Sequence, residues 1–269
     1  MASGPAAYGP VMVSRVLPAA VLGAALVATL AACGEVAYTR LEFNDTENVA
    51  ITEIRVEPGS GDLTVKTGDT KQVEIRRMVR YRSNEPDTLY KIEGTTLVLA
   101  TDCGNWCSVT FEVTAPKGVA VRGGGDSGNV NLSGVSTVDM TIDSGNITVT
   151  DATGKVTAQT DSGNVIVRGA TGGVDLKTGS GNIDADRLGG PQNTARADSG
   201  NIGLELIAPG AVTAQADSGN IRVRVPSDSY QVDARTDSGR TNIEVPDLAD
   251  GKHLLDLSTD SGNITVNTA

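Results

Sequence analysis

Hydrophobic and polar residues alternate along most of the chain in short runs that turn residues separate. After one such turn the run Ile147-Thr148-Val149 places apolar side chains at every second position. Before that turn Val138, Met140 and Ile142 alternate with polar residues in the same way. Alternation with a period of two predicts strands that are buried on one face. The pattern therefore predicts an all-β chain.

The turns themselves repeat. Seven of the eight copies begin with Asp-Ser-Gly, at Asp126, Asp143, Asp161, Asp198, Asp217, Asp237 and Asp260, and Gly179-Ser180-Gly181-Asn182 fills the gap between the third and fourth. Successive copies are 17 to 23 residues apart, and each interval holds two predicted strands. Such a period is the sequence signature of a repeat architecture.

A two-strand unit of this length cannot bury its apolar face alone, but stacked units can. We therefore predict a parallel β-solenoid with two short strands per coil of 17–23 residues, its regular part covering residues 123–269. Rungs about 4.8 Å apart would make a rod roughly 35–40 Å long. An up-and-down barrel or a sandwich is the alternative, but identical turns at a nearly fixed period favour stacking.

Stacking would align equivalent turn residues. All copies except the one at Arg240 end in asparagine, which predicts an amide ladder of Asn129, Asn146, Asn164, Asn182, Asn201, Asn220 and Asn263. The aspartates would form a second column in which neighbouring charges repel. No cofactor is needed by this pattern, although a weaker hypothesis is that calcium binds Asp126, Asp143, Asp161, Asp198 and Asp217. The Gly-Gly-x-Gly-x-Asp pattern of calcium-binding β-rolls is absent.

Residues 51–122 alternate less regularly. Strands are predicted at 51–56, 63–66, 73–76, 97–99 and 109–113. The segment Pro58–Leu63 reads as a degenerate copy of the later turns. We expect an irregular β-rich cap at this end of the solenoid. Its basic cluster Arg76, Arg77, Arg80 and Arg82 is either a patch for an anionic partner or, as we favour, a set of strand residues paired with acidic neighbours.

The first 32 residues predict an export signal. A single charge, Arg15, precedes an apolar run from Val16 to Leu30 that is too short for a transmembrane helix. Either Met1 or Met12 could be the start. Leu30-Ala31-Ala32-Cys33 resembles the lipobox of bacterial lipoproteins, in which the cysteine is acylated and becomes the first residue. This predicts a lipid on Cys33, a tether over residues 33–50 and a position on the outer face of the cell membrane; the alternative is export with a free cysteine.

Cys103 and Cys107 remain as a pair in Cys-Gly-Asn-Trp-Cys. In an exported protein such a pair predicts a disulfide, and the Gly-Asn turn would bring the sulfurs together. A redox or metal motif is the alternative, but the spacing is not Cys-x-x-Cys and no histidine lies nearby.

Composition narrows the function. The chain has 32 glycines but only one Trp, five Tyr and two Phe, which suits a thin solenoid core. A net charge of −11 argues against nucleic acid as a partner. His253 is the only histidine, which removes most histidine-based catalysis and multi-histidine metal sites.

The early Ser-Gly-Asp-Leu, the segment Val113–Val119 and the serial Asp-Ser-Gly-Asn turns together resemble the bacterial putative adhesin family of β-strand repeats. The resemblance spans about residues 50–269 and implies a solenoid at the cell surface. The family supplies no catalytic residues.

The leading interpretation is a non-enzymatic, lipid-anchored envelope protein that binds an envelope polymer, a glycan or another surface protein through repeated weak contacts. A structural or sensory partner of a membrane regulator is the second interpretation. An enzyme acting on polysaccharides is a third, although no loop insertion builds a pocket. Ice binding is disfavoured by charged residues at the outward positions.

Overall fold

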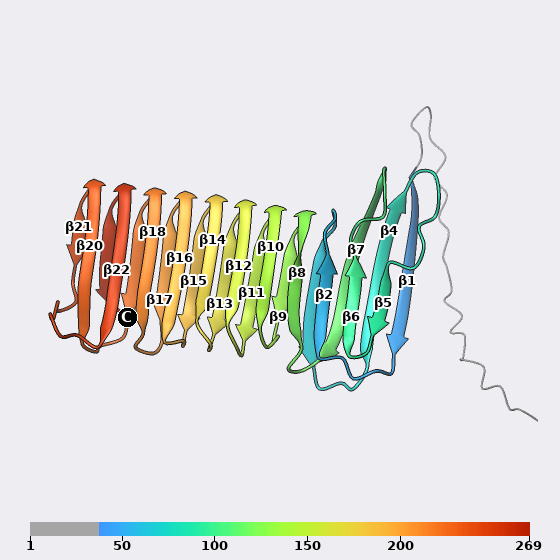
Figure 1. Ribbon diagram of the computed structural model, residues 1–269, viewed down its shortest axis with the longest axis horizontal. Helices are drawn as coiled ribbons and strands as arrows, with labels where there is room; N and C mark the ends of the chain where they lie inside the picture. The colour runs from blue at the N-terminus through green and yellow to red at the C-terminus, as the bar shows by residue number, and fades with distance from the viewer. Residues whose placement is uncertain (1–37) are drawn as a thin grey trace, which may run out of the picture.

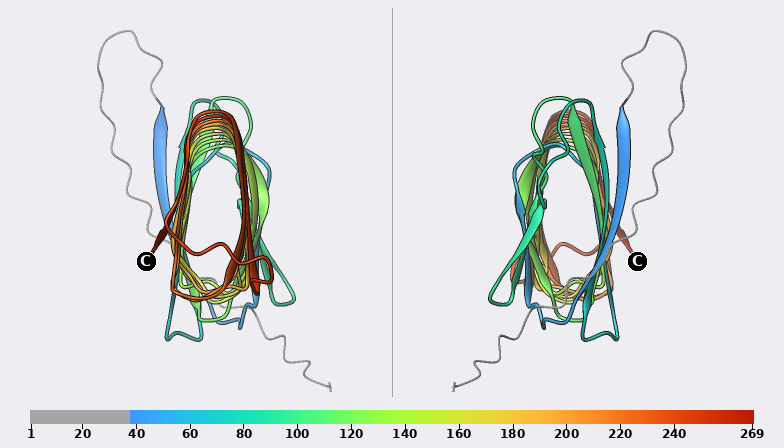
Figure 2. Two further views of the ribbon diagram at one scale, coloured as in Figure 1. Left: turned by 90° about the vertical axis from the view of Figure 1, so that its left-hand side faces the viewer. Right: turned by 90° about the vertical axis from the view of Figure 1, so that its right-hand side faces the viewer.

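The computed structural model describes residues 38–269, which form a rod of stacked rungs (Figure 1). The described residues contain two long sheets, one of 12 and one of 11 strands. Seen along the rod, the sheets face each other across a narrow core (Figure 2). The predicted all-β parallel solenoid with two strands per coil is therefore confirmed. No helix long and apolar enough to cross a membrane occurs in residues 38–269.

The 12-stranded sheet contains β1 (Thr39–Glu47), β3 (Leu63–Gly68), β4 (Val73–Tyr81), β7 (Cys107–Pro116), β9 (Val130–Ser133), β11 (Ile147–Ala152), β13 (Val165–Ala170), β15 (Ile183–Leu188), β17 (Ile202–Leu206), β19 (Ile221–Val225), β21 (Thr241–Ile243) and β23 (Ile264–Thr268). The 11-stranded sheet contains β2 (Glu53–Glu57), β5 (Tyr90–Glu93), β6 (Thr96–Ala100), β8 (Ala120–Ser127), β10 (Val138–Ser144), β12 (Val156–Ser162), β14 (Val174–Ser180), β16 (Gln192–Ser199), β18 (Ala211–Ser218), β20 (Tyr230–Ser238) and β22 (His253–Ser261).

Every second side chain of these strands points into the core. Val156 pairs in register with Val138 on one side and Val174 on the other, and all three are buried. The parallel register keeps inward positions above one another, so apolar area is buried continuously along the rod. The space between the sheets is filled mostly by Val, Ile, Leu and Ala, with Phe111 and Tyr230 among the few buried aromatic residues.

Inward threonines secure several turns. The hydroxyl of Thr160 donates to the carbonyl oxygen of Gly145, and that of Thr178 donates to Gly163, at 3.1 and 2.8 Å. Both side chains are fully buried. Because each bond runs to the preceding rung, a buried hydroxyl is satisfied and the two turns are held together.

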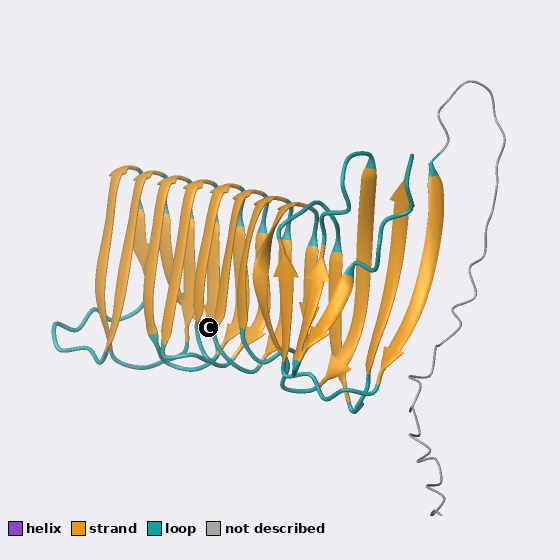
Figure 3. Cartoon of the chain, turned by 45° about the vertical axis from the view of Figure 1, so that its right-hand side comes forward, coloured by secondary structure: helices purple, strands orange, loops and turns teal. Residues whose placement is uncertain are grey.

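At the N-terminal end the spatial order of the rungs differs from the chain order. The rung β2/β3 pairs directly with β8/β9, whereas the later rung β6/β7 lies on its outer side. The antiparallel strands β4, β1 and β5 cover this end (Figure 3). The predicted cap therefore includes one regular rung, residues 53–68, that belongs to the solenoid proper.

The predicted tether over residues 33–50 needs correction in its described part. Residues 39–47 form β1, which pairs antiparallel with β4 over its whole length. Leu41 is buried and Phe43 packs against the core, which explains why the segment is ordered. Strand β5, at residues 90–93, was also not predicted.

The C-terminal end has a similar exchange of order. Strand β22 pairs with β18 on one side and β20 on the other, and β23 pairs with β19 and β21. The last rung in sequence is therefore inserted inside the last rung in space (Figure 1). The Asp217 rung consequently adjoins the Asp260 rung rather than the Asp237 rung.

Candidate functional site

The asparagines of the turns lie in one continuous ladder that runs along the rod. Each side-chain oxygen accepts from the backbone N–H of the next asparagine at 2.9–3.2 Å and from its side-chain nitrogen at 3.0–3.4 Å. The members, in spatial order, are Asn129, Asn146, Asn164, Asn182, Asn201, Asn220 and Asn263. An amide nitrogen has two hydrogens, and the ladder uses one. Each exposed rung therefore presents a further N–H donor.

The ladder ends in two different residues. At the N-terminal end Asp62 accepts from the backbone and side-chain nitrogens of Asn129, at 2.8 and 3.3 Å. Asp62 lies in the segment Pro58–Leu63. Ser60 of this segment forms a β-bridge with Ser127 of the first Asp-Ser-Gly-Asn turn, so the segment is a copy of that turn. At the other end the backbone N–H of Arg240 donates to Asn263 at 3.1 Å. An arginine side chain has no acceptor, so the ladder stops there.

Glycine is required beside each asparagine. The backbone at Gly181 has φ +154°, and a Cβ there would overlap the carbonyl oxygen of Gly163 on the preceding rung. The same clash recurs at the equivalent glycine of the neighbouring rungs. Close backbone approach of this kind is available to glycine alone, and it brings the asparagine side chains within bonding distance.

A groove of about 870 Å³ runs beside the C-terminal half of the ladder. Its upper wall is the exposed amides of Asn182, Asn201, Asn220 and Asn263, and buried isoleucines lie beneath. Its floor is the row of outward positions on β15, β17, β19, β23 and β21, in register as Asp184, Gly203, Arg222, Thr265 and Asn242. The groove crosses several rungs and therefore suits an extended ligand rather than a compact one.

Gly203 opens the floor of this groove. The neighbouring positions in the row carry Asp184 and Arg222, whereas Gly203 has no side chain. A Cβ at Gly203 would lie 3.6 Å from the nearest heavy atom, so the backbone does not require glycine here. The missing side chain is thus a property of the groove and not of the fold.

The groove is polar and unevenly charged. Arg222 lies at the middle of its floor and Arg240 at its C-terminal end, and within residues 38–269 neither has a carboxylate within 4.0 Å. Most other arginines of the solenoid, for example Arg168 and Arg224, are in ion pairs. Asp184 is the only carboxylate among the described residues that line the groove.

The aspartate column lies along the edge of the rod where the turns are. The register places Asp143 beside Asp161, since Ile142 pairs with Thr160 and Ser144 with Ser162. Gly179 interrupts the column, so Asp198, Asp217, Asp260 and Asp237 form a separate run in that spatial order. Residues 38–269 hold no group of three or more His, Cys, Asp or Glu side chains arranged to hold a metal ion. The calcium hypothesis for Asp126, Asp143, Asp161, Asp198 and Asp217 stays a prediction.

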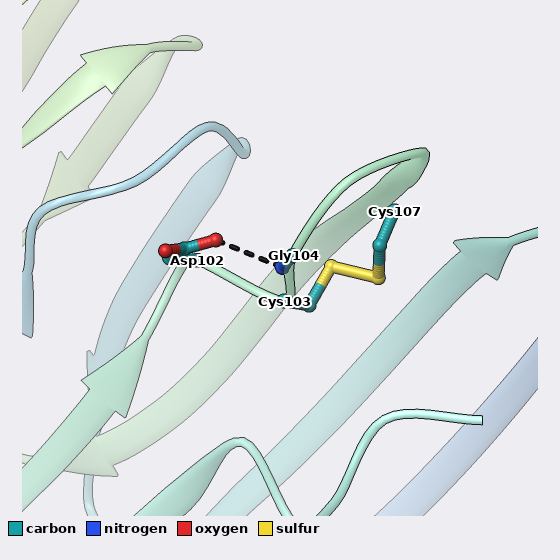
Figure 4. The surroundings of a disulfide bond; sticks show 4 residues. All are labelled: Asp102, Cys103, Gly104 and Cys107. Atoms are coloured by element: carbon teal, nitrogen blue, oxygen red, sulfur yellow. Dashed lines mark hydrogen bonds between the residues drawn. A yellow bond between two sulfur atoms is a disulfide. The ribbon is translucent and has the colours of Figure 1, made fainter. Parts of the chain in front are cut away.

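Cys103 and Cys107 form a disulfide with a Cα–Cα distance of 5.5 Å (Figure 4). The carboxylate of Asp102 accepts from the backbone N–H of Gly104 at 2.8 Å, which forms a turn at Cys103. This loop immediately precedes β7 at the N-terminal end of the rod. Cys33, the predicted lipid site, lies outside the described residues.

The basic cluster of the cap divides into two pairs. Arg76 bonds Glu42 and Glu112 at 2.8 and 3.0 Å, and Arg77 bonds Asp45 at 3.0 Å. For Arg76 and Arg77 the predicted pairing with acidic neighbours is confirmed. Arg80 and Arg82 instead stack on aromatic rings.

The repeat pattern of the sequence does not predict the groove. The asparagine spacing predicted the ladder, but nothing in the repeat distinguishes Gly203 from a turn glycine except its place two positions after Asn201. That position is outward on every rung. A comparison of the outward positions alone would have shown the gap.

Comparison with known proteins agrees with this architecture. A protein described as a putative adhesin from Bacteroides fragilis is 16% identical, with a TM-score of 0.51 over 85% of this chain and 97% of that one. A putative cell adhesion protein from Clostridium sporogenes and a putative lipid binding protein from Parabacteroides distasonis are each 11% identical over 85% of this chain, and over 100% and 96% of their own. Their TM-scores are 0.25 and 0.27, so the likeness of fold rests on the first. No curated protein matches.

The family model for Toastrack DUF4097 matches residues 51–267, which include every rung of the solenoid. The stacked rungs, the repeated turns and this match together show that the chain belongs to the Toastrack DUF4097 family.

Proposed function

We propose that the protein is an exported, lipid-anchored and non-enzymatic envelope protein whose groove binds an extended, hydroxyl-rich polymer such as an envelope glycan. The observation that carries this is the groove itself. It aligns exposed amide donors with the rungs, so an extended chain would meet the same donor at each step of about 4.8 Å. Repeated weak contacts along one chain add to a useful affinity.

The polarity of the groove supports a polar polymer rather than an apolar one. The unused amide hydrogens match hydroxyl, carbonyl and carboxylate acceptors. Arg222 and Arg240 add charge-assisted donors at the middle and at one end. A polymer that carries carboxylates should therefore bind more tightly than a neutral one.

The same lining argues against hydrolysis. Cleavage of a glycosidic bond generally uses two carboxyl groups on either side of the bond. Asp184 is the only carboxylate among the described lining residues, and it is paired with Arg168, which also pairs with Asp186 outside the lining. His253 lies on β22, in the opposite sheet, 5.8 Å from the ring of Tyr230. The groove therefore suits binding without turnover.

The groove is tested by filling its floor. Gly203→Ile adds a β-branched side chain that the strand tolerates and that occupies the groove. Polygalacturonate and neutral dextran serve as probes at 0.15 M salt, where the net negative charge of the protein is screened. We expect the unmodified chain to bind polygalacturonate more tightly than dextran, and Gly203→Ile to lose both.

The matched control is Thr148→Ile, which makes a similar change in the same outward row but outside the groove. It should bind as the unmodified chain does. Equal binding by Gly203→Ile and Thr148→Ile would contradict the groove, and release of shorter sugars from polygalacturonate would contradict the non-enzymatic function.

Anchoring is tested separately at Cys33. The serine variant Cys33→Ser cannot carry a thioether lipid and should appear in the medium of cells that express it, whereas the unmodified chain should stay with the membrane. Lipidation would be refuted if Cys33→Ser stayed with the membrane and the chain with Cys33 had the mass of the polypeptide without a lipid.

A further inference from the structure

Four side chains form a stack at the N-terminal end of the rod. The guanidinium carbon of Arg80 lies 4.2 Å from the ring centre of Tyr38, and that of Arg82 lies 4.7 Å from the same ring. Arg82 is also 4.8 Å from the ring of Trp106. We call Tyr38, Arg80, Arg82 and Trp106 the aromatic–arginine cluster. Each arginine is held over a ring face by cation–π attraction.

The two arginines keep their charge available. Within residues 38–269 no carboxylate lies within 4.0 Å of either, whereas Arg76 and Arg77, earlier on β4, are both in ion pairs. Nε of Arg82 is buried and has no hydrogen-bond partner among the described residues. Two cations without a carboxylate partner therefore lie beside the exposed rings of Tyr38 and Trp106.

Trp106 is presented to the outside under constraint. The residue is 65% exposed, the largest exposed fraction among the exposed large hydrophobic residues at positions 38–269. Its backbone has φ +62°, which is unusual for a large side chain, and the Cys103–Cys107 disulfide closes the loop that holds it. Strain of this kind persists only where the surroundings enforce it, and it concentrates at functional sites.

The cluster also lies where the chain enters the rod. Tyr38 directly precedes β1, the outermost strand of its sheet, and it follows Cys33 by five residues. Five extended residues span at most about 18 Å. A lipid on Cys33 would therefore hold the cluster within that distance of the membrane surface.

We propose that the aromatic–arginine cluster docks on an anionic phospholipid membrane. Tryptophan and tyrosine are the side chains that favour the membrane–water interface, because one end is apolar and the other polar. Arginine guanidinium groups bind lipid phosphates through two parallel hydrogen bonds. The docking site deepens the proposed anchoring: the lipid holds the chain to the membrane, and the cluster fixes which end of the rod faces it.

The consequence is an orientation. With the N-terminal end on the membrane, the groove on β15 to β23 lies at a distance from it, because those strands belong to the C-terminal half of the rod. A polymer bound in the groove would then be held at a distance from the membrane set by the stacked rungs.

Trp106 is the only tryptophan, so its emission reports on this site alone. Vesicles of phosphatidylglycerol mixed with phosphatidylcholine are compared with vesicles of phosphatidylcholine, with the full chain present in both. With the anionic vesicles we expect the fluorescence emission of Trp106 to shift to shorter wavelength and to be quenched by brominated lipid. Arg80→Gln with Arg82→Gln should lower partition into these vesicles about thirtyfold, measured by co-sedimentation.

The matched control is Lys177→Gln with Arg196→Gln, which removes two exposed neighbouring charges on the opposite sheet. It should partition like the unmodified chain, and circular dichroism checks that both variants are folded. Vesicle binding through Cys33 with unchanged Trp106 emission would overturn the docking site and leave the anchor intact. A Trp106 shift in Cys33→Ser would support the docking site even if lipidation failed.

Discussion

A single asparagine on each rung satisfies two groups of the next one. The side-chain oxygen of Asn182 accepts from the backbone nitrogen of Asn201 at 2.9 Å and from its side-chain nitrogen at 3.2 Å. One residue type thus closes the turn and links it to its neighbour. The repetition of Asn along the sequence is the consequence.

Replacing one asparagine of the ladder should lower the free energy of unfolding by more than the contribution of one ordinary hydrogen bond. In Asn182→Ala the backbone N–H of Asn201 loses its acceptor, and the side-chain bond from residue 182 to Asn164 is lost while the backbone bond remains. A donor left without a partner costs about 1–3 kcal/mol. We expect the free energy of unfolding to fall by about 2 kcal/mol in urea denaturation.

Asn242→Ala is the control for this change. Asn242 also lies on an exposed strand of the same sheet, but its side chain donates only to Glu244, at 3.0 Å. Its loss should cost about 0.5 kcal/mol or less, as is typical of surface substitutions. Equal losses for the two variants would mean that the ladder adds nothing to stability.

The sequence predicted this ladder because the asparagines recur at a fixed place in each turn. It did not predict how the ladder ends. Asp62 supplies an oxygen acceptor where no donor is needed, and Arg240 supplies only its backbone N–H. These roles depend on which rungs are outermost, which no single turn encodes.

Among the strands, turns of identical sequence do not determine the stacking order. Ser218 has the same neighbours in sequence as Ser238 and Ser261, and any two of these turns could stack. The structure pairs Ser218 with Ser261 and Ser261 with Ser238. The segment between β21 and β22 settles the choice: Asp247 bridges to Tyr230 and accepts from the backbone N–H of Val232 at 2.9 Å. This contact occupies the outer edge of β20.

Two isoleucines distinguish the observed order from the order of the sequence. Ile264 is fully buried between Ile221 and Thr241, whereas Ile243 is half-buried on the terminal rung. Ile264→Ala should lower the free energy of unfolding by about 3 kcal/mol and Ile243→Ala by about 1 kcal/mol. Stacking in chain order would place Ile264 on the terminal rung and reverse the two values in chemical denaturation.

Strand β1 was missed for a physical reason. Its first inward residues, Leu41 and Phe43, are apolar, but Asp45 continues the same face. That carboxylate faces Arg77, which is nearly buried and lies 4.6 Å from the ring centre of Phe43. Next to it, burial raises the pKa of Tyr90, whose hydroxyl donates to Glu47 at 2.9 Å. The acidic residues in the second half of this strand are accommodated by Arg77 and Tyr90, which lie far away in the sequence.

The outer face of β1 should respond to acid. The hydrogen bond from Arg76 lowers the pKa of Glu42 below its ordinary value of 4.5. A lowered pKa stabilises the fold above that ordinary value, and the contribution is lost as the pH falls through the lowered one. Hydrogen-exchange protection of β1 should therefore decrease relative to β13 below about pH 4.5. In Glu42→Gln the protection should already be reduced at neutral pH, and the acid-induced loss should be smaller. An identical pH profile in both proteins would contradict the role of this pair.

At the scale of the whole molecule, the rod must protect two open ends. The N-terminal end is covered by antiparallel strands, with β1 and β5 outermost. At the C-terminal end the ladder stops at Arg240, and Arg235 pairs with Asp233 on the outer strand at 2.9 Å. Charges on an edge strand discourage pairing with another chain. The repeat therefore stops at residues that depart from its own consensus.

The glycine column makes the stack behave as one unit. Each of these glycines approaches the carbonyl oxygen of the rung before it, so a side chain at one position forces two rungs apart, and every rung beyond them must shift. Gly181→Ala adds both this overlap and an unfavourable φ of +154° near the middle of the rod. We expect it to cost about 3 kcal/mol or more, with a lower melting temperature across all rungs in one transition. Gly68→Ala, where a Cβ meets nothing within 4 Å, should leave the transition unchanged. Two separate transitions in Gly181→Ala would show instead that the rod yields at the substituted rung.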